Sequence, residues 1–313
     1  MYLLNKEFIT GMVCMMKIKE NNEKVSLRIL FSVFFLSTLA AVVIRTLQMF
    51  KYIDHETGFN NGSDIVSFVL YLVVAVAALC FVIVSYLSKE SSEIELHGHK
   101  NTFTAVGCIA FALSLIYDWI NSFLSSTTAT GSSTGSAFKD MMVSGALPLI
   151  MQSLFALMSM IFMIILAKDF LKGTDKASKR KYLCLAPLGW CGFRLIHCFV
   201  RQISFIKVSD LFLELIMLSF MIMFFQALAQ VNSSVYSDGF RWRIPAFGFS
   251  AAVIAATLNV ARLVYSMVNG AGALNAEHPF CITDLMFSLF AVTLVAGVTG
   301  KKAENNENAT LKS

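Results

Sequence analysis

Long apolar stretches dominate the pattern of hydrophobic and polar positions along this chain. A helix needs about 20 mostly apolar residues to cross the hydrocarbon of a bilayer, whereas a transmembrane strand alternates apolar and polar positions. The sequence contains eight stretches of the helical kind, over Leu27–Met49, Asp64–Leu87, Thr102–Leu124, Ser144–Ala167, Tyr182–Phe199, Ser209–Ala229, Ile244–Val268 and Cys281–Val298. The pattern therefore predicts an all-α polytopic membrane protein with eight transmembrane helices.

Composition agrees with this prediction. Hydrophobic residues make up 57% of the chain and charged residues 14%, whereas soluble domains carry about 45–50% and about 25%. These values exclude an ordinary soluble enzyme and a disordered chain. Residues 27–298 form the predicted transmembrane domain, with a cytoplasmic N-terminal segment over 1–26 and a polar cytoplasmic tail over 299–313.

The N-terminal segment leaves two alternatives open. Lys6 and Glu7 interrupt its apolar run, which is not typical of a signal peptide. In one alternative, Met1–Lys19 forms a short helix at the membrane interface. In the other, translation begins at Met15 or Met16 and only a basic flank precedes the first span.

Basic residues are distributed unevenly between the two sides of the predicted spans. The side of the N-terminus carries 18 lysines and arginines and the opposite side 4, while three lie inside spans. Because cytoplasmic loops are enriched in basic residues, we expect a cytoplasmic-membrane protein with both termini inside. A scattered net charge of +5 does not favour nucleic acid, so the lipid bilayer is the expected partner, and the oligomeric state stays open.

The odd-numbered spans end with related sequences. A charged residue is followed three positions later by a polar one and five positions later by Phe or Met, in Arg45-Thr-Leu-Gln48-Met-Phe50, Asp118-Trp-Ile-Asn121-Ser-Phe123, Arg194-Leu-Ile-His197-Cys-Phe199 and Arg262-Leu-Val-Tyr265-Ser-Met267. Three of the following spans open with a hydroxyl residue and an aspartate, both helix N-cap formers: Ser63-Asp64, Ser209-Asp210 and Thr283-Asp284. This pattern predicts four helical hairpin repeats, over residues 27–88, 102–168, 182–230 and 244–298. A two-span unit returns the chain to the same side, so the repeats are parallel.

The spacing that recurs in these spans places a polar stripe near the outer end of each odd-numbered span, because positions i, i+3 and i+7 share a helix face. In a structural interpretation, each arginine pairs with the aspartate that opens its own hairpin: Arg45 with Asp64, Arg194 with Asp210 and Arg262 with Asp284. Asp118 has no arginine in its hairpin, so it must find one in another unit or hold a proton. Glu214 is expected to pair with Arg194.

In a functional interpretation, the stripes converge into an outward-facing polar pocket. The candidate ligand-binding residues are then Arg45, Asp118, Arg194, His197, Glu214, Arg262 and Tyr265, and the three arginines favour a small polar or anionic solute. The leading hypothesis is therefore binding, sensing or transport of such a solute. The alternatives are a membrane scaffold or partner-binding subunit without a ligand, and a membrane-embedded enzyme acting on lipid.

Catalytic and metal-binding motifs do not favour the enzyme alternative. The chain lacks GxxxxGK[ST] and HExxH. Cys184, Cys191 and Cys198 recur every seven residues, which separates neighbours by about 10.5 Å along a helix, too far to bind one ion together. We expect no catalytic residues, metal or cofactor. Whether the protein is an enzyme stays open, with the sequence favouring the view that it is not.

Cysteine labelling tests the predicted orientation. In a variant that lacks the native cysteines, Ser132→Cys should react with a membrane-impermeant maleimide in intact cells. Lys176→Cys should react only after the cells are opened, because the basic side faces the cytoplasm. The reverse pattern of labelling would overturn the topology.

Overall fold

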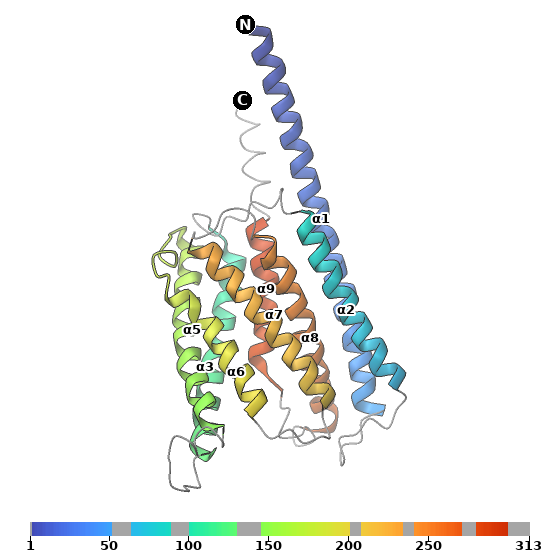
Figure 1. The fold of residues 1–313 in the computed structure, drawn as a ribbon, viewed down its shortest axis with the longest axis vertical. Helices are drawn as coiled ribbons and strands as arrows, with labels where there is room; N and C mark the ends of the chain where they lie inside the picture. Colours follow the sequence, from blue (N-terminus) through green and yellow to red (C-terminus); the bar gives the residue numbers. More distant parts are fainter. Residues whose placement is uncertain are drawn as a thin grey trace.

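The computed structural model is mostly helical over the residues that it describes, which are 2–51, 64–88, 100–129, 145–200, 208–233, 241–270 and 280–299 (Figure 1). The helices are α1 (Tyr2–Lys51), α2 (Asp64–Leu87), α3 (Thr102–Ala129), α5 (Ala146–Lys172), the 3₁₀ turn η1 (Leu183–Leu185), α6 (Ala186–Val200), α7 (Val208–Asn232), α8 (Arg243–Asn269) and α9 (Ile282–Thr299). No strand occurs in these ranges.

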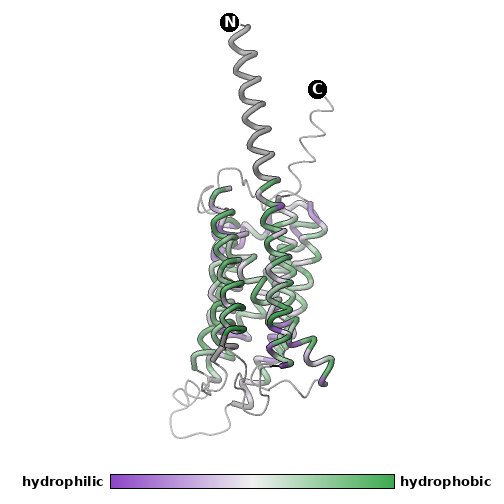
Figure 2. Tube along the Cα trace, turned by 90° about the vertical axis from the view of Figure 1, so that its right-hand side faces the viewer, coloured by the Kyte–Doolittle hydropathy of each residue, from purple (hydrophilic) through white to green (hydrophobic). Residues whose placement is uncertain are grey.

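The helices correspond to the eight predicted spans. Seven of the described helices are long and apolar enough to cross a membrane, and α9 contributes a shorter apolar helix over Ile282–Gly297. Figure 2 shows hydrophobic positions along most of the bundle and hydrophilic ones mainly toward its ends. The chain is therefore a multi-pass helical membrane protein, while its membrane and its orientation stay predictions.

Six helices form a closed ring in chain order. Contacts join α3 to α5, α5 to α6, α6 to α7, α7 to α8 and α8 to α9, and α9 packs back against α3. The α1–α2 hairpin lies outside this ring, against α8. Three predicted hairpins thus build the ring and the first is attached to it, while their relation as sequence repeats stays a prediction.

The two ends of the bundle carry different features. We call the end at which α3, α6 and α8 finish the site end, and the end at which α5, α7 and α9 finish the loop end. The N-terminal part of α1 continues the first span as one helix and projects beyond the bundle at the loop end, where α9 also finishes (Figure 1). The two alternatives for this N-terminal segment stay predictions.

Small residues allow α8 to occupy a central position. This helix contacts α1, α2, α7 and α9, and its buried face includes Ala246, Gly248, Ser250, Ala251, Ala252 and Ala255. Helix association in a bilayer depends on close packing, because lipid is as apolar as the side chains themselves. The Phe224 ring of α7 lies 3.0 Å from where a Cβ atom on Gly248 would be. Short side chains on α8 thus permit four neighbours.

Aromatic rings fill the middle of the helix ring. Phe111 of α3 stacks on Phe290 of α9, with 5.5 Å between ring centroids. Phe224 meets Phe287 edge to face at 5.4 Å, and Phe225 stacks on Phe111 at 6.1 Å. All five rings are buried. We call these five residues the aromatic floor, because they lie on the loop-end side of the polar site described next.

Glycine brings α3 and α9 together. A Cβ atom built on Gly107 would collide with the Thr293 side chain, and one on Gly297 would collide with Thr104 and Asn101. The same contact contains a hydrogen bond from Thr104 Oγ1 to the Thr293 carbonyl oxygen, at 3.1 Å. The closure of the ring therefore depends on positions without a side chain.

Gly107→Ala tests this closure. The added methyl group must displace Thr293, and overpacking of this kind costs about 1–3 kcal/mol, so the thermal unfolding temperature in detergent should fall. Gly192→Ala is the matched control, because nothing lies within 4 Å of its Cβ position and alanine is the better helix former. Equal unfolding temperatures for the two variants would contradict the proposed role of Gly107.

Candidate functional site

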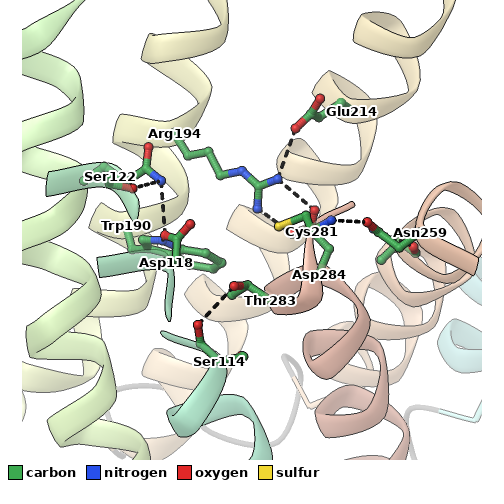
Figure 3. Close-up of polar contacts among 12 residues, drawn as sticks. Ser114, Asp118, Ser122, Trp190, Arg194, Glu214, Asn259, Cys281, Thr283 and Asp284 are labelled. Atoms are coloured by element: carbon green, nitrogen blue, oxygen red, sulfur yellow. Dashed lines mark hydrogen bonds and ion pairs between the residues drawn. The ribbon is translucent and has the colours of Figure 1, made fainter. Parts of the chain in front are cut away.

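Polar side chains from five helices of the ring meet in the half of the bundle nearer the site end (Figure 3). We define the polar cluster as Asp118 of α3, Gln152 of α5, Trp190 and Arg194 of α6, Glu214 of α7 and Asp284 of α9. Among these, Asp118, Gln152, Trp190, Arg194 and Asp284 are buried. Charged groups within membrane helices are costly and mark functional sites by default, so this cluster is the leading candidate site.

Arg194 links three helices of the ring. Its Nη1 and Nη2 atoms donate to the two carboxylate oxygens of Asp284, with Nη2 at 2.7 Å from Oδ2. Nη2 also donates to Oε1 of Glu214 at 3.0 Å. Asp284 is 1% exposed and Arg194 8%. A bidentate pair of this kind fixes geometry as well as charge, so α6, α7 and α9 are held in one relative arrangement.

Asp118 is held by neutral donors. Its Oδ2 atom accepts hydrogen bonds from Trp190 Nε1 at 2.6 Å and from Gln152 Nε2 at 3.1 Å. Gln152 also donates to Ser122 Oγ, at 3.0 Å. In the described parts of the chain, no lysine or arginine lies within ion-pair distance of Asp118. This carboxyl group therefore has a fixed orientation without a counter-ion from those parts.

The second oxygen of Asp118 differs from the first. Within the ranges that the structure describes, Oδ1 accepts no hydrogen bond. It is also not among the enclosed polar atoms that lack a hydrogen-bond partner. Asp118 as a whole is 8% exposed. One oxygen thus anchors the side chain while the other faces space that is not fully closed.

Trp190 connects the two halves of the cluster. Its indole N–H binds Asp118, and the Arg194 Cζ atom lies 5.9 Å from its ring centroid. The indole also contacts Phe111 of the aromatic floor, with 5.9 Å between centroids. The polar cluster therefore rests on the aromatic floor.

The start of α9 is fixed by its neighbours, which positions Asp284. The Cys281 backbone N–H donates to Asn259 Oδ1 of α8 at 2.9 Å, and Thr283 Oγ1 donates to the Ser114 carbonyl oxygen of α3 at 3.1 Å (Figure 3). Asp284 lies in the first turn of α9, where the helix dipole favours a negative charge. Both flanking helices of the ring thus set the position of this carboxylate.

One predicted pairing is confirmed and one is wrong. Glu214 binds Arg194 as predicted, and Arg194 reaches a carboxylate in another hairpin. Arg262 was expected to pair with Asp284, but both oxygens of Asp284 bind Arg194, because α6 turns its arginine toward the start of α9. The side chains of Asp64 and Asp210, predicted partners of Arg45 and Arg194, lie outside the described residues.

The other stripe residues lie in different surroundings. Arg45 Nη1 donates to Gln48 Oε1 at 3.0 Å, and Gln48 donates to Ser67 Oγ at 3.1 Å. Arg262 of α8 is close enough to act electrostatically on Arg45. Tyr265 follows on α8, with its ring 5.2 Å from that of Phe50 on α1. These residues form a second polar group at the α1–α8 contact, and their predicted role in ligand binding stays a prediction.

The imidazole of His197 lies next to Gly145 at the start of α5, 3.5 Å from where a Cβ atom of that glycine would be. Two members of the cluster, Gln152 and Trp190, were missing from the predicted ligand-binding set. Their signal in the sequence was a polar or amphipathic residue inside a span instead of at its ends, but that signal does not say which way the side chain faces.

The balance of charge in the cluster changes the expected chemistry. The cluster contains three carboxyl groups and one guanidinium group, and two of the carboxyl groups bind the guanidinium group. The charge of Arg194 is already compensated by two carboxylates, so the cluster offers no net positive charge to an anionic solute. An arrangement rich in carboxylate oxygens can accept a cation or a proton. No group of three or more His, Cys, Asp or Glu side chains that could hold a metal ion occurs in the described part of the chain.

A double-mutant cycle tests the central ion pair. Arg194→Gln should destabilise the protein by about 3–5 kcal/mol, because it leaves Asp284 buried without its partner. Arg194→Gln combined with Asp284→Asn should cost less than Arg194→Gln alone. Glu214→Gln should cost least, since Glu214 is only half-buried. Additive losses in unfolding free energy would contradict the pairing.

Comparisons with known proteins add no relative to this description. No family model, no curated protein and no solved structure matches the chain. Neither fold-level analogy nor a relative's activity thus bears on the function. The functional argument therefore rests on the polar cluster, whose geometry comes from five helices of one closed ring.

Proposed function

We propose that this protein binds a small polar solute that carries a positive charge, for sensing or transport, and that Asp118 supplies the counter-charge. The observation that carries the proposal is the carboxyl group of Asp118. Two donors fix its Oδ2 atom, whereas Oδ1 accepts no hydrogen bond from the described residues. A carboxylate in a medium of low dielectric constant attracts a cation strongly, and its charge is costly to bury without one.

The sign of the ligand follows from Arg194. The predicted anionic solute would need a guanidinium group whose positive charge is not already compensated. Arg194 directs both terminal nitrogens to Asp284 and one of them also to Glu214. Asp118, by contrast, offers an acceptor and no donor when it is ionised. Within the described cluster, a cationic group therefore fits better than an anionic one.

The position of the aromatic floor supports entry of the solute from the site end only. Phe111 precedes Asp118 by seven residues on α3, which is about 10.5 Å along the helix. Its ring stacks on Phe290 and contacts Trp190. A solute at Asp118 would thus reach the site from the site end and would meet stacked rings beyond it. Transport requires those rings to separate, whereas sensing requires only that binding shifts the helices that hold the cluster.

Thermal unfolding of the purified protein tests the proposed ligand. Methylamine, ethanolamine and choline, offered to the protein in detergent, should include at least one that raises the unfolding temperature, because a ligand at 100 times its Kd stabilises by about 2.7 kcal/mol. Acetate and ethylene glycol should not do so. Asp118→Asn, which keeps the shape of the side chain and removes the charge, should abolish the shift.

The control for this experiment is Asp175→Asn, which removes an exposed carboxylate at the loop end of the bundle. It should keep the full amine-dependent shift. A shift of equal size in Asp118→Asn would refute the role of Asp118. Stabilisation by acetate and by none of the amines would refute a cationic solute and return the argument to the second polar group at the α1–α8 contact.

A further inference from the structure

Six basic residues lie on one short connection at the loop end of the bundle. We define the basic loop as residues 168–181, which run from the end of α5 to the turn η1. Its exposed basic side chains are Lys168, Lys172, Lys176, Lys179, Arg180 and Lys181. The loop has one exposed acidic side chain, Asp175. The proposed solute site lies toward the other end of the bundle, so this surface needs a separate explanation.

The backbone of the basic loop is held by a buried aspartate. Gly173 ends α5 with a φ of 70°, and its N–H donates to the Asp169 carbonyl oxygen at 2.7 Å. The Asp169 carboxylate accepts hydrogen bonds from Thr174 Oγ1 at 2.5 Å and from the Ala177 N–H at 2.6 Å. Asp169 is 6% exposed. Its charge therefore organises the inside of the loop and leaves the surface basic.

The basic loop is also attached to two other helices. The Ala177 carbonyl oxygen accepts a hydrogen bond from Asn232 Nδ2 at the end of α7, at 3.2 Å. The Phe170 carbonyl oxygen accepts one from the Asn101 N–H at the start of α3, at 2.7 Å. Ala177 is 1% exposed. The loop is thus a folded element, and its basic side chains extend from a fixed backbone.

The position of the basic loop indicates its partner. The apolar span of α5 ends at Lys172 and the next span begins at Leu183, so the loop lies where the hydrocarbon of a bilayer would end. Tyr182 follows the bases and is 90% exposed, and Leu171 and Leu185 are also exposed. Basic side chains beside aromatic and aliphatic ones suit the boundary between phosphate headgroups and acyl chains.

We infer that the basic loop is a preformed binding site for the headgroups of anionic phospholipids in the adjacent leaflet. Lysine and arginine side chains donate to phosphate oxygens, and each base near an anionic lipid surface contributes about fivefold in affinity. The rule that basic loops stay in the cytoplasm requires only the number of charges. It does not require the internal hydrogen bonds of Asp169. A preformed site does require them, because they lower the entropic cost of binding.

The experiment measures how soluble lipids shift the unfolding temperature of the full-length protein in detergent. Dioctanoylphosphatidylglycerol is the anionic probe, and dioctanoylphosphatidylcholine and inorganic phosphate are the comparison probes. Lys176→Gln, Lys179→Gln and Lys181→Gln together should weaken the phosphatidylglycerol effect about 100-fold in concentration. The matched control combines Lys301→Gln, Lys302→Gln and Lys312→Gln, which removes the same charge from the C-terminal tail and should leave the effect unchanged.

Two further variants test preorganisation. Asp169→Asn keeps all six basic residues of the loop and weakens the hydrogen bonds within it. Thr174→Val removes one of these bonds. Each folded variant should require a severalfold higher phosphatidylglycerol concentration than the unaltered protein. Unchanged concentrations in both would overturn a preformed site. An equal loss in the tail control, or equal stabilisation by phosphatidylcholine or by phosphate alone, would overturn binding of anionic headgroups by this loop. The Asp118 variant should respond normally to lipid, so the two proposals fail separately.

Discussion

The arrangement of the ring depends on how one buried positive charge is compensated. An arginine inside a membrane bundle is stable only when its donors meet acceptors. Arg194 meets this condition through Asp284 and Glu214, which belong to α9 and α7. The three helices cannot rotate independently about their axes without breaking at least one of these contacts. The ion pairs therefore specify the relative rotation of three helices, which close packing alone would leave less well defined.

The packing around the polar cluster makes that compensation possible. Gly107 and Gly297 let α3 and α9 approach closely, which brings the start of α9 against Ser114 of α3. The same approach places Asp118 and Asp284 in one interior. The aromatic floor then separates this interior from the loop end and leaves the polar groups on one side of it. Apolar packing and polar geometry are thus two consequences of the same helix contacts.

Three aspartates among the described residues have different roles, and their neighbours distinguish them. Asp284 neutralises an arginine, and Asp169 accepts two hydrogen bonds from its own loop. Asp118 accepts two hydrogen bonds from neutral donors on one oxygen. The first two are satisfied by the fold and explain its stability. The third has an oxygen that the described residues do not engage, and this is why the proposed function is placed there.

The sequence by itself determined the class of protein and the positions of its spans. The hydrocarbon thickness of a bilayer sets the length of an apolar helix, so each span can be recognised without knowledge of the others. It also predicted the pairing of Arg194 with Glu214, because these residues lie near facing ends of helices joined by a short connection. The tertiary structure alone decided that Asp284 binds Arg194 and not Arg262. It also decided that Gln152 and Trp190 face Asp118. The physical reason is that spacing along a helix says which residues share a face, whereas the direction of that face depends on how all the helices pack against one another.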